Sequence, residues 1–67
     1  KKFNVSGQVI GENFEGAEVT LSGAMADHSA VTNEFGDFEI QSVVSGIYEL
    51  TVKGTEIEIF IDSVEIA

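Results

Sequence analysis

Residues 31–40, Val-Thr-Asn-Glu-Phe-Gly-Asp-Phe-Glu-Ile, contain the strongest turn signal of the chain, between two short runs of alternating apolar and polar residues. Asparagine favours the first position of a type I turn, and glycine adopts the left-handed backbone conformation that closes a hairpin. Asn33 and Gly36 occupy those two places. The segment therefore predicts a hairpin that returns the chain directly into a strand at residues 38–40.

The same period-two alternation extends from this turn in both directions. Such alternation is typical of antiparallel strands with one buried face, here divided by glycine-containing turns at spacings of roughly 8 to 12 residues. The helix-tolerant segment 24–28 is too short for more than one helical turn. We predict a seven-stranded antiparallel Greek-key β-sandwich in a single domain over residues 1–67. Its strands are expected at residues 3–9, 17–21, 29–33, 38–40, 48–52, 56–61 and 64–66.

Large aromatic side chains in predicted loops either fold back onto the core or contact another surface. We expect the turn to hold Phe35 against the end of the sheet, and we expect Tyr48 to point inward from its strand. For Phe14, burial and contact with a neighbouring domain are both open. His28, the only histidine, is expected in a solvated loop without catalytic partners.

Twelve acidic residues against three lysines give the chain a net charge of -9. Nucleic acids and anionic lipids are poor partners for it, because both require lysine and arginine to neutralise phosphate. No run approaches the roughly 18 apolar residues of a membrane span, so no membrane insertion is expected. The absence of cysteine excludes disulfides and thiolate metal sites. The acidity favours solubility and protection of strand edges, with a basic partner or a cation as the alternatives.

Two groups of acidic residues are candidate sites. Asp27, Glu34 and Asp37 fall in or beside neighbouring predicted loops and offer carboxylate oxygens to Ca²⁺, although no D-x-D-x-D-G loop is present and solvated turn acids are the simpler interpretation. Glu56 and Glu58 lie two residues apart on the outward face of a predicted strand. They either meet a basic partner or guard the strand edge, and their mutual repulsion is relieved if Lys53 lies across from them.

Four fragments occur in order along the chain: Val5-x-Gly7-x-Val9, Gly16-Ala17-x-Val19-x-Leu21, Thr32-Asn33-x-x-Gly36-x-Phe38-x-Ile40 and Gly46-x-Tyr48-x-Leu50-x-Val52. Together they resemble the carboxypeptidase regulatory-like domains of the transthyretin-like (prealbumin-like) superfamily. The turn at residues 31–38 is also similar to that of transthyretin-like domains at the C-terminus of ferredoxin-type iron-sulfur subunits. Those subunits belong to molybdopterin oxidoreductases such as pyrogallol hydroxytransferase.

This resemblance implies a non-catalytic accessory domain, a C-terminal appendage of an iron-sulfur electron-transfer subunit cut out of a larger protein. Iron-sulfur clusters would lie in the parent protein, with no cofactor in this domain. The implied partners are parent-chain domains or a catalytic partner subunit.

Two other functions compete with this one. The 5-hydroxyisourate hydrolases of the same superfamily use histidines, an arginine and a tyrosine-arginine-glycine-serine tail, whereas this chain has one histidine and no arginine and ends in Val64-Glu65-Ile66-Ala67. That enzymatic function therefore fails on composition. The alternative is an extracytoplasmic carbohydrate- or peptide-binding module, which the absence of tryptophan makes a weaker hypothesis. The sequence leaves the compartment open.

Overall fold

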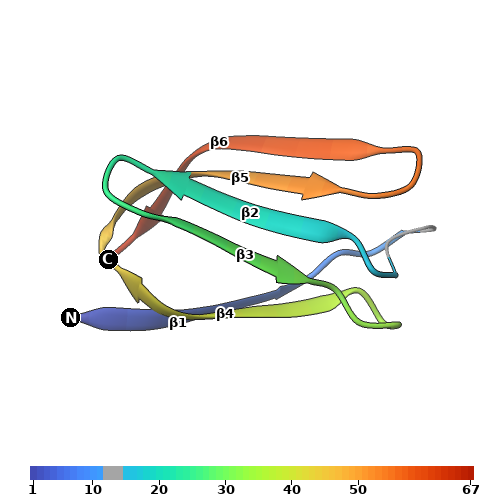
Figure 1. Ribbon diagram of the computed structural model, residues 1–67, viewed down its shortest axis with the longest axis horizontal. Coiled ribbons are helices and arrows are strands. Elements are labelled where there is room, and N and C mark those ends of the chain that lie inside the picture. Colours follow the sequence, from blue (N-terminus) through green and yellow to red (C-terminus); the bar gives the residue numbers. More distant parts are fainter. Residues whose placement is uncertain (12–14) are drawn as a thin grey trace.

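The computed structural model describes residues 1–11 and 15–67, and this part of the chain forms six strands in two antiparallel sheets (Figure 1). The smaller sheet pairs β1 (Lys2–Gln8) with β4 (Asp37–Val44). The larger sheet has the order β3 (Asp27–Val31), β2 (Glu18–Gly23), β5 (Gly46–Lys53) and β6 (Glu58–Ile66). The prediction of an all-β antiparallel fold is confirmed. Within the described ranges, no helix has the length and apolarity needed to cross a bilayer.

The core lies between the two sheets and is formed by inward side chains at every second strand position. Val19 and Leu21 of β2 stand beside Val52 and Leu50 of β5 in register, so their side chains share one face of the sheet. Tyr48 is only 4% exposed, as predicted, and its hydroxyl donates a hydrogen bond of 2.8 Å to the carbonyl oxygen of Val44. The buried apolar residues are Ala17, Val19, Leu21, Ile40, Val43, Tyr48 and Val52.

The predicted turn at Asn33–Asp37 is present, but it does not form a hairpin. Gly36 has φ 80° and donates its N–H to the Asn33 carbonyl oxygen at 3.0 Å, while Asn33 Oδ1 accepts the N–H of Phe35 at 2.8 Å and of Asp37 at 3.0 Å. The strands on either side, β3 and β4, belong to different sheets. The turn therefore carries the chain from one layer of the sandwich to the other, and the hairpin prediction is wrong.

Phe35 is 68% exposed, so the prediction that it closes the end of the core is also wrong. The backbone of Val9 occupies the inner side of the turn, where its N–H donates to the Gly36 carbonyl oxygen at 2.9 Å. A Cβ on Gly36 would collide with the Val9 carbonyl oxygen, which is why glycine is required there. With that position filled, the Phe35 side chain projects outward.

The last two predicted strands are one continuous strand, β6, interrupted by a β-bulge. Asp62 and Ser63 together stand opposite Glu49, and Ser63 has φ 61°. The small sheet contains a second bulge, in which Gln41 and Ser42 stand opposite Asn4 and Ser42 also has φ 61°. An extra residue reverses the alternation beyond it. The described residues consequently form six strands where seven were expected.

His28 lies in β3, not in a loop, because the turn before this strand is short: Gly23 N–H donates to the Ala26 carbonyl oxygen at 3.1 Å. His28 pairs with Leu21 across the sheet and is half-buried, with its ring centroid 6.3 Å from that of Tyr48. Its Nε2 atom is buried and has no hydrogen-bond partner. The prediction of a solvated loop histidine is therefore wrong.

Candidate functional site

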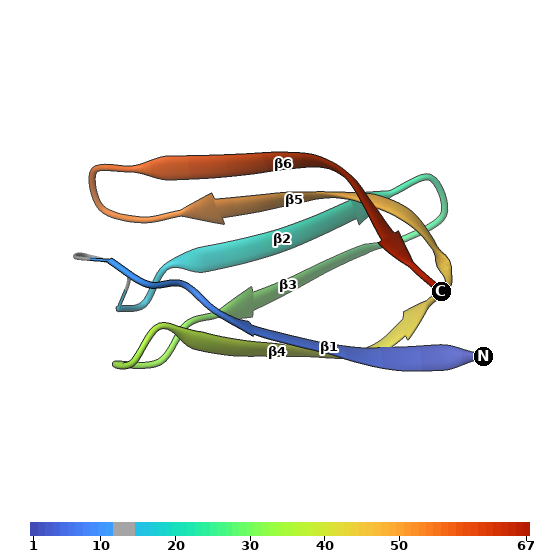
Figure 2. The same ribbon diagram turned by 180° about the vertical axis from the view of Figure 1, so that it is seen from behind.

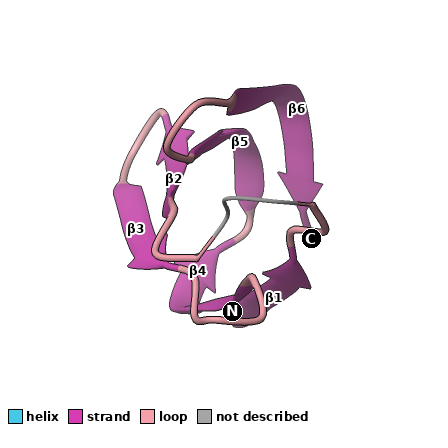
Figure 3. Ribbon diagram, turned by 90° about the vertical axis from the view of Figure 1, so that its right-hand side faces the viewer, coloured by secondary structure: helices cyan, strands magenta, loops and turns pink. Residues whose placement is uncertain are grey.

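An open apolar groove of about 310 Å³ is lined by residues of β1, β4, β5 and β6 and of the segment after β1. Figure 3 shows the two sheets nearly end-on, with β6 and β1 at their edges. The groove exists because the two strands of the small sheet face four strands of the large one. Ile61, which pairs with Leu50 on the inward face, is left 46% exposed. Most of the groove's lining residues belong to the end of β1, the second half of β5 and the first half of β6, and these parts of the strands lie away from the two termini (Figure 2). Its lining consists of Gly7, Gln8, Val9, Ile10, Phe38, Leu50, Val52, Ile59 and Ile61.

The backbone of β1 borders this groove with hydrogen-bonding groups that point out of the sheet. Among the described residues, β1 pairs only with β4. The N–H of Val9 is directed toward the β4 side, where it bonds Gly36, and this direction alternates along an antiparallel strand. The N–H and C=O groups of Asn4, Ser6 and Gln8 therefore point to the free edge.

The outer face of the large sheet carries Glu58, one of the two acidic residues singled out near the C-terminal end of the sequence. Glu18, Lys53 and Glu58 are register neighbours, and Lys53 Nζ lies 3.9 Å from a Glu58 carboxylate oxygen. Lys53 therefore lies across from Glu58, the arrangement under which it can relieve acidic repulsion, and such an exposed pair contributes at most about 1 kcal/mol. Glu56 lies in the turn before β6, closed by a 2.8 Å bond from Gly54 N–H to the Ile57 carbonyl oxygen, so its predicted strand position is wrong.

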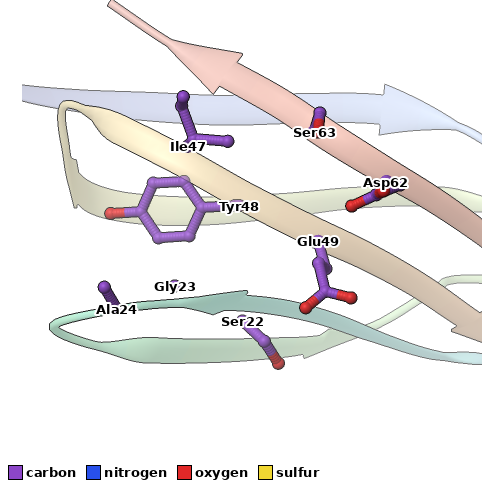
Figure 4. Close-up of a pocket in the computed structure, with 8 residues that line it drawn as sticks. All are labelled: Ser22, Gly23, Ala24, Ile47, Tyr48, Glu49, Asp62 and Ser63. Atoms are coloured by element: carbon purple, nitrogen blue, oxygen red, sulfur yellow. The ribbon is translucent and has the colours of Figure 1, made fainter.

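A second, polar pocket of about 370 Å³ lies where the β6 bulge opens the sheet (Figure 4). Glu49 reaches across toward its register neighbour Ser22 on β2, while Asp62 and Ser63 of the bulge line the same pocket. The described residues that line it thus supply two serine hydroxyls and two carboxylates, while the Tyr48 hydroxyl donates its hydrogen bond to the Val44 carbonyl oxygen.

The three calcium candidates are not brought together. Asp27 begins β3, whereas Glu34 and Asp37 lie in or beside the turn that follows the other end of that strand. Five residues at about 3.3 Å each separate the two ends of β3 by more than 10 Å. In residues 1–11 and 15–67, no three acidic or histidine side chains are arranged to hold a metal ion.

Phe14 lies outside the described residues, so the question of its contact with a neighbouring domain is unchanged. The groove was missed because its isoleucines carry the same alternation as any inward strand residue. They are exposed because the large sheet has more strands than the small one. That difference depends on residues 58–66 forming one strand of the large sheet.

No family model, curated protein or solved structure matches the chain.

Proposed function

We propose that this chain is a non-catalytic accessory domain that binds another polypeptide, and the groove between β1 and β6 is the observation that carries this proposal. Its lining is predominantly apolar, and its rim residues Ile10 and Ile61 are 86% and 46% exposed. Contiguous apolar surface left in water is unfavourable, and on folded proteins it marks sites that another molecule covers. Among the described residues, the edge of β1 beside the groove has no strand partner, and it adds hydrogen-bonding groups to the same surface.

A finer assignment rests on sequence resemblance. We propose a transthyretin-like domain at the C-terminus of an iron-sulfur electron-transfer subunit, with the clusters in the parent protein and none here. The groove would then pack on another parent domain or on the catalytic partner subunit. The four ordered sequence fragments and the all-β fold support this assignment.

The accessory function is tested by hydrogen exchange, compared between the isolated domain and the domain within its natural polypeptide. We expect slower exchange in one contiguous surface of the natural polypeptide. Identical exchange at every residue would overturn the proposal.

The iron-sulfur assignment has a separate test in the coding sequence on either side of this segment. Upstream cysteines with ferredoxin-type spacing would support it. A signal peptide with tandem sandwich domains would replace it with the extracytoplasmic binding module.

A further inference from the structure

We infer that the partner enters as an extended segment that alternates apolar and basic side chains, adding to the free edge of β1 as a third strand of the small sheet. This inference rests on the proposed function and names the chemistry of its partner. Three observations support it: the free backbone edge of β1, the apolar lining of the groove and the negative charge of the chain.

The β1 edge is the one best suited to accept a strand. The extra residue of the bulge in the small sheet belongs to β4, so the seven residues of β1 form a regular strand. The backbone groups of Asn4, Ser6 and Gln8 point outward along this strand. The competing edges are poorer templates, because β6 and β4 are each broken by a bulge and β3 has only five residues. An incoming strand would lie about 4.8 Å from β1 and would form main-chain hydrogen bonds with it.

A strand at that position also covers the groove. Its side chains would alternate between the inner and the outer face, as those of β1 do. The inward ones would enter the space bordered by Leu50, Ile59 and Ile61 and remove the exposed part of Ile61 from water. This requires apolar residues at every second position of the partner.

Charge decides between a foreign strand and a second copy of this chain. The chain carries a net charge of -9, and the exposed residues Glu39 and Asp37 of β4 pair with Ser6 and Gln8 of β1 in the small sheet that the new strand would join. A second copy would bring another nine negative charges. A strand with lysine or arginine on its outward face is attracted to the same surface.

The test uses two nine-residue peptides, one alternating valine with lysine and the other valine with glutamate, and measures binding to the 67-residue chain by fluorescence anisotropy. We expect the lysine peptide to bind at least tenfold more tightly. Hydrogen exchange with the lysine peptide bound should slow at the amides of Asn4, Ser6 and Gln8.

Two pairs of variants localise the site. Ser6→Pro removes an outward N–H without changing the hydrogen bonds to β4. It should lower the affinity for the lysine peptide at least tenfold relative to Ser6→Ala. Ile61→Asn should weaken it in the same way, whereas Phe60→Asn, the matched change on the opposite face of β6, should leave the affinity within about twofold.

Three results would overturn the inference. One is equal binding of both peptides, and another is unchanged binding by Ser6→Pro. The third is a concentration-dependent dimer of the free chain that protects the same amides, since this would assign the edge to a second copy. Protection of a different surface in the natural polypeptide would contradict the strand while leaving the accessory function intact.

Discussion

Replacement of Thr32 by valine tests a buried hydrogen bond that joins β2 to the β3–β4 turn. Thr32 is 4% exposed, and its Oγ1 accepts the N–H of Ala17 at 2.8 Å. Its own N–H donates to the Ala17 carbonyl oxygen at 2.9 Å, so the two residues are held together by backbone as well as side chain. Valine has nearly the shape of threonine but offers no acceptor. The buried Ala17 N–H would then lack this partner, at a cost of about 1 to 3 kcal/mol.

That loss is large for a domain of this size. At about 0.05 to 0.15 kcal/mol per residue, 67 residues have a free energy of unfolding of roughly 3 to 10 kcal/mol. In so small a domain, each kcal/mol changes Tm by about 4 to 8 °C. A loss of about 2 kcal/mol in Thr32→Val should therefore lower Tm by about 8 to 16 °C.

The measurement is urea and thermal unfolding followed by circular dichroism, with Thr32→Ser as the control. Serine keeps the hydroxyl and loses one methyl group, which costs about 0.8 kcal/mol. The order of stability should be wild type, Thr32→Ser, Thr32→Val. A valine variant as stable as wild type would refute the reasoning, and so would a serine variant that is the less stable of the two.

Three further outcomes are expected in thermal melts. Gly36→Ala should destabilise the domain by more than about 1 kcal/mol, because its φ of 80° and the nearby Val9 carbonyl oxygen both exclude a Cβ; an unchanged melt would show that the turn rearranges at no cost. His28→Leu should leave stability equal or raise it, because it removes a buried Nε2 without a partner, and a loss above about 1 kcal/mol would contradict this. Raising the salt concentration to about 0.5 M should raise Tm by screening the net charge of -9, whereas a flat response would show that this repulsion is unimportant.

Local patterns in the sequence were sufficient for the fold class and for the turn at Asn33–Asp37. Alternation identifies strands because one face is buried, and asparagine and glycine have conformational preferences that act within a few residues. Neither kind of signal specifies which sheet a strand joins. The same turn chemistry suits a hairpin and a crossing between layers, and for that reason β3 and β4 were wrongly paired.

The break in alternation at Asp62-Ser63 was visible in the sequence, but its meaning was not. A loop between two strands and a bulge within one strand produce the same change of phase, and the choice depends on whether β5 continues alongside. Residues Gly46–Lys53 do continue, and they pair with β6 on both sides of the bulge. The groove followed from that pairing, so it could not be predicted before the strand count was known.

The bulge in β6 also determines which changes of length the strand tolerates. Ile59 before it and Ile66 after it both pack against the core, although they lie an odd number of residues apart. Deleting Ser63 would leave the two isoleucines an even number of residues apart, so β6 would gain an uninterrupted ladder and Ile66 would keep its inward side. A one-residue deletion within β2, which has no bulge, would instead turn every side chain beyond it to the opposite face. The bulge is therefore the place where β6 can lose one residue in evolution without exposing its core face.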